Sequence, residues 1–159
     1  MEVIDDFLPS YQFKQLQSLL LGDSFPWYYQ PTTISTGGPP QFFHKFYSIN
    51  EINSDFYFIL ETSLIKIGLK KLIRAKVNLN PRTVFHRKGG WHIDFIDDPP
   101  ITTAILYLNS NNGWTEFKKG GRVKSVANRV VIFDSNLEHS GVTCTDEKRR
   151  MVINFNYEV

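Results

Sequence analysis

The chain of 159 residues has one cysteine and no long hydrophobic run. A single cysteine, Cys144, excludes an internal disulfide framework and fits a reducing compartment. No stretch of about 18 apolar residues is present, so no membrane-spanning helix is expected. The acidic start, residues 1–6, lacks the basic residues and apolar run of a signal peptide. These absences predict a cytoplasmic protein with no membrane partner.

A strong charge of either sign is also absent. The 18 Lys and Arg against 16 Asp and Glu give a net charge of +2, which is too small to indicate nucleic acid. Two basic runs, residues 66–76 and 118–124, are interpreted as solvated faces and hairpin tips. Hydrophobic and charged fractions of 42% and 21% are those of an ordinary folded domain rather than a disordered chain.

The first 70 residues are predicted to hold two helices and a loop. The first helix, residues 9–22, has Phe13, Leu16 and Leu20 on one face. The second, residues 54–68, begins with a Ser-Asp cap and ends at a glycine. Between them, residues 31–40 are rich in Thr, Ser, Gly and Pro, which is typical of either a lid over a site or a mobile surface loop.

Beyond residue 72 the pattern changes to short strands separated by turns. Strands are predicted at residues 72–79, 83–86, 101–109, 114–117, 122–126, 129–134 and 150–157. Residues 111–113 and 119–121 are predicted hairpin turns. We therefore expect a mainly β protein with N-terminal helices, whose fold is a double-stranded β-helix, or jelly roll. Residues 1–159 form one domain in this interpretation, with a helical and loop part at 1–70 and a jelly-roll core at 72–157.

Alternation along one predicted strand indicates how that sheet is covered. Ala104, Leu106 and Leu108 share one face, and Thr103, Ile105 and Tyr107 share the other. Apolar residues on the first face predict that the helices cover the outer surface of this sheet.

The strongest functional signal is His92-Ile93-Asp94, followed after 44 residues by His139. Residues i and i+2 of a strand point the same way, so His92 and Asp94 can hold one ion where the backbone bends. Gly89-Gly90 before the pair and residues 97–100 after it provide such irregularity. Two imidazoles and one carboxylate are the facial triad of a non-haem Fe(II) oxygenase, which leaves positions open for O2 and a cosubstrate.

The two other histidines are not predicted ligands. His44 lies in an aromatic run and is interpreted as a strand or pocket-wall residue. His86 is near His92 in sequence, but no carboxylate accompanies it at ligand spacing.

An arginine pair, Arg149-Arg150, follows His139 by ten and eleven residues. A buried guanidinium suits the far carboxylate of 2-oxoglutarate, which it binds through paired hydrogen bonds. Alternation places Arg150 on the strand face that carries two asparagines, so Arg150 is the predicted cosubstrate residue. Tyr107 is a second candidate, unless it is a core tyrosine, and Asn80 is a weaker one.

Six segments resemble the Fe(II)/2-oxoglutarate oxygenases, in the order found in that family. They are residues 92–94, 104–109, 114–117, 128–133, 139–141 and 150–154. The prolyl-4-hydroxylase-like branch, with its small members encoded by bacteriophages, is the most similar, and for a viral protein the location would be the host cytoplasm. The resemblance implies a jelly roll with iron on His92, Asp94 and His139, and cosubstrate on Arg150 and Tyr107.

The expected function is therefore a dioxygenase that uses Fe(II), O2 and 2-oxoglutarate to hydroxylate a second substrate. Analogy with the family favours a peptide or protein, with a prolyl residue as the target. Four aromatic residues are candidates for the pocket rim or for plain packing: Tyr29, Trp91, Phe95 and Trp114. A basic base-flipping lid is absent, which argues against nucleic acid.

Two alternatives remain open. A zinc hydrolase also uses three protein ligands and an open position, but no glutamate base stands beside either histidine and Arg150 would have no role. A jelly-roll binding module that has lost the chemistry would not be expected to keep all three ligands.

Overall fold

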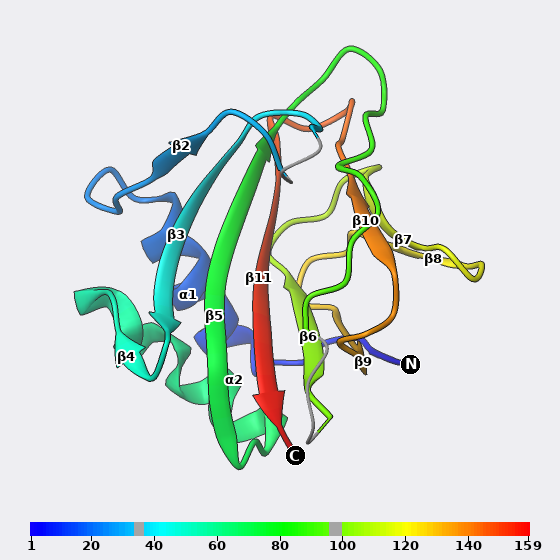
Figure 1. Ribbon diagram of the computed structural model, residues 1–159. Coiled ribbons are helices and arrows are strands. Elements are labelled where there is room, and N and C mark those ends of the chain that lie inside the picture. Colours follow the sequence, from blue (N-terminus) through cyan, green and yellow to red (C-terminus); the bar gives the residue numbers. More distant parts are fainter. Residues whose placement is uncertain (34–36, 96–99) are drawn as a thin grey trace.

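The computed structural model describes residues 1–33, 37–95 and 100–159. In these residues a large antiparallel sheet faces a small one, and the helices lie against the outer side of the large sheet (Figure 1). The large sheet has the order β1-β9-β6-β11-β5-β3-β2, with β4 paired to β3, and the small sheet has the order β10-β7-β8. This arrangement confirms the predicted jelly-roll class.

The strands of the large sheet come from both halves of the chain. They are β1 (Glu2–Ile4), β2 (Tyr28–Gln30), β3 (Gln41–Ser48), β4 (Glu51–Ile52), β5 (Lys71–Pro81), β6 (Thr102–Tyr107), β9 (Val130–Asp134) and β11 (Arg149–Glu158). The small sheet consists of β7 (Trp114–Phe117), β8 (Arg122–Lys124) and β10 (His139–Val142). The helices are α1 (Ser10–Leu21), a 3-10 helix η1 (Asp55–Leu60) and α2 (Glu61–Ile67). None of the described helices has the length and apolarity needed to cross a bilayer.

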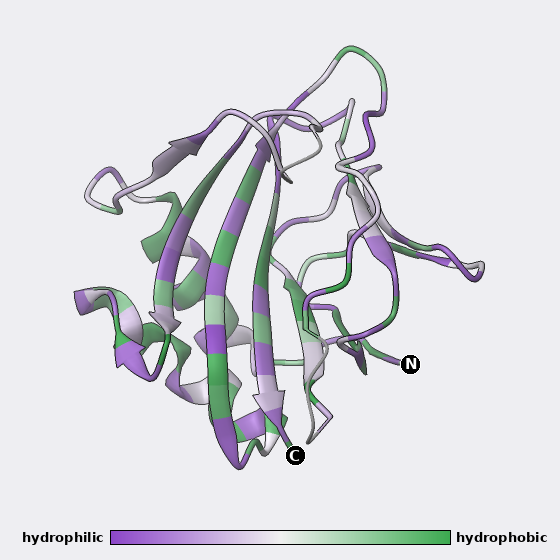
Figure 2. Cartoon of the chain, in the orientation of Figure 1, coloured by the Kyte–Doolittle hydropathy of each residue, from purple (hydrophilic) through white to green (hydrophobic). Residues whose placement is uncertain are grey.

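The large sheet separates two apolar clusters. Leu106 of β6 belongs to the cluster that the sheet shares with α1, where Leu16 and Leu20 are buried. Ile105 and Tyr107, on the opposite face of β6, belong to a smaller cluster against the small sheet. The predicted alternation along this strand is therefore confirmed, and Figure 2 shows the same alternation of polar and apolar residues along β5. Each fully buried leucine contributes about 1.5–3 kcal/mol by its removal from water.

Two of the sequence-based predictions are wrong. Residues 83–86 form no strand, and Val84 and Phe85 are 84% and 79% exposed. Their β-forming side chains meet no neighbouring strand, and such residues favour a strand only where they pack against one. Residues 111–113 are not a hairpin turn, because they lead from β6 of the large sheet to β7 of the small one. The turn at residues 119–121 does join the antiparallel pair β7 and β8.

Four strands of the N-terminal part were not predicted. Residues 1–70, which were expected to hold only helices and a loop, also contain β1 to β4. All four strands join the large sheet. The longest of them is β3, which pairs with β5; within it only His44 was interpreted as a strand or pocket-wall residue. Both predicted helices are present, the second as η1 followed by α2.

Asn128 joins the N-terminal segment to the jelly roll. Its Oδ1 accepts a hydrogen bond from the backbone N of Leu8, and its Nδ2 donates to the Leu8 carbonyl, both at 2.8 Å. The residue has a φ of 64°, in the left-handed region that asparagine tolerates better than most residues. One side chain thus fixes the entry to α1 and the turn before β9.

Replacing Asn128 should therefore lower the free energy of unfolding. Asn128→Ala removes two buried hydrogen bonds of about 1 kcal/mol each and leaves at positive φ a residue that tolerates the left-handed region less well than asparagine, which costs about 1 kcal/mol more. Asn128→Gly loses the hydrogen bonds alone and should retain more stability than the alanine variant. Urea unfolding of the three proteins measures both differences, and an alanine variant as stable as the wild type would contradict this role.

Candidate functional site

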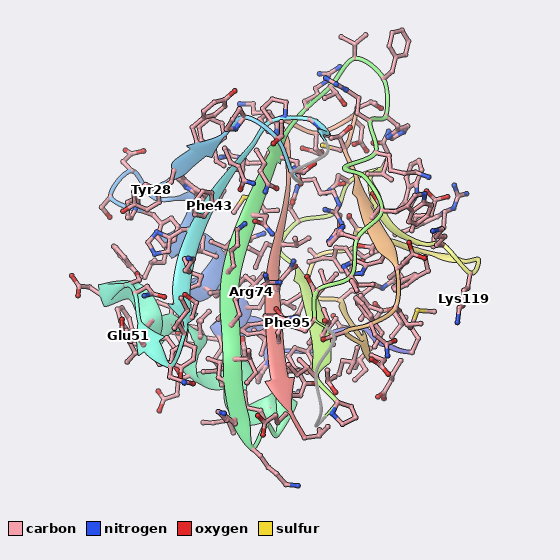
Figure 3. All side chains as sticks on the ribbon, in the orientation of Figure 1. Tyr28, Phe43, Glu51, Arg74, Phe95 and Lys119 are labelled. Atoms are coloured by element: carbon pink, nitrogen blue, oxygen red, sulfur yellow. The ribbon has the colours of Figure 1, made fainter. Side chains whose placement is uncertain are left out.

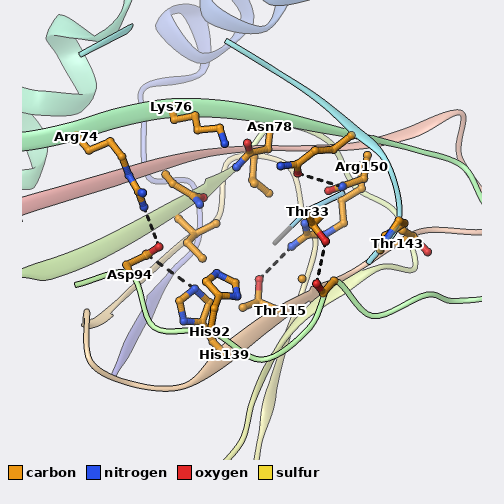
Figure 4. Close-up of a pocket in the computed structure, with 18 residues that line it drawn as sticks. Thr33, Arg74, Lys76, Asn78, His92, Asp94, Thr115, His139, Thr143 and Arg150 are labelled. Carbon is orange, nitrogen blue, oxygen red and sulfur yellow. Dashed lines mark hydrogen bonds and ion pairs between the residues drawn. The ribbon is translucent and has the colours of Figure 1, made fainter. Parts of the chain in front are cut away.

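A polar cavity lies on the face of the large sheet that points away from the helices (Figure 4). β5 contributes alternate side chains to it, from Arg74 to Asn80, and β11 contributes Arg150 and Asn154. The opposite wall carries His92, from the segment before β6, and residues of β7 and β10. The cavity therefore lies between the two sheets, where a jelly roll is open at one end.

Two of its histidines are held together by the backbone. His92 and His139 form an isolated antiparallel bridge, in which each backbone N donates to the other's carbonyl, at 3.1 and 2.9 Å. Their ring centroids are 4.4 Å apart. Nδ1 of His92 lies 3.2 Å from the Gly90 carbonyl, and Nδ1 of His139 lies 2.9 Å from the Leu137 carbonyl. Because a carbonyl can only accept, each Nδ1 carries the proton and each Nε2 keeps a free lone pair.

Asp94 is held by three side chains of the large sheet. Its Oδ1 accepts from Arg74 Nη2 at 2.8 Å, and its Oδ2 accepts from Thr103 Oγ1 at 3.0 Å and Asn156 Nδ2 at 3.1 Å. Oδ2 also lies 3.9 Å from His139 Nε2. Ligand atoms of His92, Asp94 and His139 all lie within 4.8 Å of one another. The structure thus brings together the three predicted ligands at a separation that suits one divalent ion.

The charges in this group favour metal binding. Burial alone would raise the pKa of Asp94, but Arg74 and His139 more than offset it, so the pKa lies below its ordinary value and the carboxyl is ionised near neutral pH. Burial lowers the pKa of His139, with Asp94 opposing part of the effect. A carboxylate and neutral imidazoles are the protonation states that a metal requires.

Arg150 is a buried cation at the other end of the cavity. It is 3% exposed, its Nε donates to Ser125 Oγ and its Nη2 donates to Thr115 Oγ1, both at 3.0 Å. None of the ion pairs among the described residues includes it, and burial lowers its pKa. A buried guanidinium without a counter-charge is unfavourable, so the arrangement favours an anionic ligand. Gly113 makes room for it, since a β-carbon there would lie 2.9 Å from Arg150 Cδ.

The other predicted cosubstrate residues lie around Arg150. Asn80, paired with Arg150 in the β5–β11 register, lines the cavity. Tyr107 is fully buried behind the wall, and its hydroxyl donates to Thr115 Oγ1 at 2.7 Å, the same atom that accepts from Arg150. Direct contact of Tyr107 with a cosubstrate stays a prediction. In the structure its hydroxyl shares Thr115 Oγ1 with Arg150, and the guanidinium of Arg150 lies over its ring at 5.6 Å. Arg149 does not line this cavity.

The remaining histidines lie outside the metal group. His44 is buried on the helix side of the sheet and hydrogen-bonds Ser54 Oγ and the Pro26 carbonyl. Nδ1 of His86 donates to the Thr143 carbonyl at 2.7 Å, and the His86 ring packs on Trp114.

The four candidate rim aromatics have separate positions. Phe95 packs on Arg74 at 5.0 Å, and Trp91 packs on Lys88 at 4.3 Å. Tyr29 is 62% exposed on β2. None of the four lines the cavity in the part of the chain that the structure describes.

Part of the predicted lid can be placed. Thr33 and Pro39 line the cavity, and Thr33 Oγ1 donates to the Gly89 carbonyl at 2.8 Å. Residues 34–36 of the loop, and 97–99 of the predicted irregularity after Asp94, lie outside the described residues. A lid role stays a prediction.

Sequence reasoning missed the supports of Asp94. Arg74, which lines the cavity, was not singled out, and Asn156 was considered only as one of the two asparagines on the strand face of Arg150. The available signal was polar alternation within the 72–79 strand, which was interpreted only as a strand.

Known proteins resemble this chain in sequence and in structure. Residues 82–158 match the sequence family described as the 2OG-Fe(II) oxygenase superfamily. No curated protein matches the chain by sequence. A prolyl-4-hydroxylase of Pseudomonas putida is similar in structure, with a TM-score of 0.64 and 17% identity over 99% of this chain and 92% of that one.

Two further solved structures are similar over nearly the whole chain. A Trichoplax adhaerens prolyl hydroxylase, in complex with a hypoxia inducible factor oxygen degradation domain peptide fragment, has a TM-score of 0.65 and 14% identity over 99% of this chain and 83% of that one. HygX of Streptomyces hygroscopicus, with nickel and 2-oxoglutarate bound, has a TM-score of 0.64 and 12% identity over 98% and 81%. At these identities the likeness establishes the fold.

The role of the residues that orient Asp94 can be tested by replacing Asn156, which is uncharged. Asn156 bridges Arg74 Nε, at 2.9 Å, and Asp94 Oδ2. Asn156→Leu should weaken the binding of a divalent metal by about 10- to 100-fold, because the ligand loses its orientation. Calorimetric titration with Fe(II) under anaerobic conditions measures this. Glu158→Gln, on the same strand but at the surface, is the control, and equal affinity in all three proteins would contradict the role of Asn156.

Proposed function

We propose that this chain, a member of the 2OG-Fe(II) oxygenase superfamily with a prolyl-4-hydroxylase-like fold, is a dioxygenase that uses Fe(II), 2-oxoglutarate and O2. The overall reaction converts 2-oxoglutarate and O2 into succinate and CO2 and leaves one oxygen as a hydroxyl on a second substrate. One observation carries the proposal. The ligand atoms of His92, Asp94 and His139 converge in the same cavity that holds the buried cation of Arg150, which forms no ion pair within the described part of the chain.

The three ligands fit Fe(II). Both Nε2 atoms are free because both Nδ1 atoms donate to carbonyls, and the carboxylate is ionised next to Arg74. Two nitrogens and one oxygen on one side of an ion match the facial triad, and Fe(II) supplies the site at which O2 is activated. Arg74, Thr103 and Asn156 hold the Asp94 carboxylate in one orientation.

At the far end, Arg150 would bind the distal carboxylate of 2-oxoglutarate. Thr115 and Ser125 fix the guanidinium, and Tyr107 fixes Thr115. Asn80 is the additional polar residue at this level of the sheet. Because the guanidinium is already oriented and dehydrated, little freedom is lost when the anion binds.

For the second substrate we propose a peptide or protein, with a prolyl residue as the target. The fold shared with two prolyl hydroxylases supports this. The net charge of +2 does not favour nucleic acid.

A zinc hydrolase and an inactive binding module are distinguished from the oxygenase by one measurement. Anaerobic addition of Fe(II) and 2-oxoglutarate should give the visible charge-transfer band of the chelate only in the oxygenase. The hydrolase and the binding module would both remain colourless.

Removal of a metal ligand should abolish turnover. Asp94→Ala and His139→Ala are expected to reduce succinate formation to the rate without protein, because two ligands do not retain Fe(II) against solvent. His86→Ala is the matched control, since its imidazole lies outside the metal group and its loss should leave succinate formation intact. Wild-type turnover in either ligand variant would remove the triad from the proposal.

The paired arginines allow a second matched test. Arg150→Lys keeps the charge but loses the fork of parallel donors, so the KM for 2-oxoglutarate should rise by about 10- to 100-fold. Arg149→Lys, one residue away and outside the cavity, should leave it unchanged. Steady-state succinate assays give both values, and the reverse order would assign the cosubstrate to Arg149.

A further inference from the structure

β5 carries a row of polar side chains along the cavity at every second residue: Arg74, Lys76, Asn78 and Asn80. The two ends of this row are already engaged. Arg74 contacts Asp94, and Asn80 lies opposite Arg150. Lys76 lies between these ends, paired in register with Asn154 of β11. Figure 4 shows its ammonium group pointing into the cavity.

Two charged neighbours of Lys76 in the sheet are cations, and Asp94 offsets only part of their effect. Lys45 of β3 is its direct cross-strand partner, and Arg74 is its neighbour on the same face of β5. Like charges directly opposite in a sheet are destabilising. Among residues 1–33, 37–95 and 100–159, neither Lys76 nor Lys45 takes part in any of the ion pairs. The Lys76 ammonium lies over the Phe43 ring, at 4.6 Å from its centroid.

This environment disfavours the charged form of the amine. Burial, followed by Arg74 and then Lys45, lowers the pKa of Lys76 to about 8, and Asp94 offsets only part of the effect. At neutral pH the amine is still mainly protonated. A negatively charged ligand would remove the repulsion and restore an ordinary pKa.

The cosubstrate does not account for this cation. Its distal carboxylate is assigned to Arg150, which pairs with Asn80, four residues from Lys76 along β5. Four residues of an extended strand span about 13 Å. Lys76 therefore lies away from the distal carboxylate, at the end of the cavity where the metal ligands lie and where a second substrate would approach.

We propose that Lys76 binds a carboxylate of the second substrate, so that the enzyme oxidises a residue that has an acidic neighbour. The inference rests on the proposed oxygenase function and adds the charge class of its substrate. One ammonium recognises one anion, whereas binding of a nucleic acid requires the neutralisation of several phosphates. An acidic peptide fits the single cation better.

The test uses the full chain with Fe(II), 2-oxoglutarate and O2. The probes are capped tetrapeptides, acetyl-Ala-Pro-X-Ala-amide and acetyl-X-Pro-Ala-Ala-amide, in which X is Glu, Gln or Lys. Succinate formation above the peptide-free rate and the gain of one oxygen in the peptide are both measured. We expect kcat/KM for a Glu peptide to exceed that for its Gln partner by about tenfold or more, as expected for one charge-assisted contact.

Two variants assign the preference to Lys76. Lys76→Gln should remove the difference between the Glu and Gln peptides, and Lys76→Glu should reverse the preference in favour of the Lys peptide. Lys71→Gln is the matched control: Lys71 lies on the same strand but pairs with Glu158 outside the cavity, and its loss should leave the Glu preference unchanged.

The outcomes separate this inference from the proposed function. Peptide-free succinate formation without any gain for Glu peptides over their Gln partners would overturn the acidic substrate and leave the oxygenase standing. A Lys76→Gln variant whose only change is a higher KM for 2-oxoglutarate would also overturn it, by assigning Lys76 to the cosubstrate. If the wild-type protein formed no succinate from 2-oxoglutarate, with or without a peptide, the result would contradict the proposed function itself.

Discussion

The site depends on one ion pair, between Arg74 of β5 and Asp94 of the segment that precedes β6. Asp94 is almost fully buried, with a side-chain exposure of 4%, and a buried carboxylate without partners would be protonated or expelled. Arg74, Thr103 and Asn156 together keep it ionised and oriented. The same contacts tie an irregular segment to the rigid sheet. Because His92 is two residues from Asp94 and bridges to His139, this anchoring also sets the positions of the other two ligands.

Much of the candidate site could be predicted, because its main residues belong to short sequence motifs. His92, Asp94 and His139 meet at ligand distance, as the spacing of the motif and strand alternation indicated. Alternation also distinguished Arg150 from Arg149, since the face of β11 that carries asparagines is the face that lines the cavity. The core of the fold was predictable for a similar reason, because most strands from β5 onward carry a period-2 pattern of polar and apolar residues. Figure 3 shows Arg74 of β5 beside Phe95.

Other features depend on contacts between distant segments and leave little trace in the sequence. β1 has three residues and pairs with β9, more than 120 positions away, so no local pattern marks it as a strand. Val84 and Phe85 have strand-forming side chains but no partner strand, and their exposure shows that propensity alone did not decide the structure. The hydroxyl of Tyr107, whose contact with the cosubstrate stays a prediction, donates to Thr115 of the opposite sheet, and no sequence pattern indicated this partner. The packing of the two sheets decides which residues contact each other across the cavity, and alternation along a strand does not specify this packing.

The alternation of β5 has a consequence for how this enzyme can change. The same strand presents the support of Asp94, the cation at Lys76 and the asparagine opposite Arg150, at two-residue intervals. Inserting or deleting a single residue within it would turn the part of the row on one side of the change toward the helices. Selection can therefore alter substrate choice by exchanging the side chain at position 76. The length of the strand is constrained, because Arg74 and Asn80 must keep facing the cavity. Divergence in specificity should proceed through point substitutions here and through length variation only in the connecting loops.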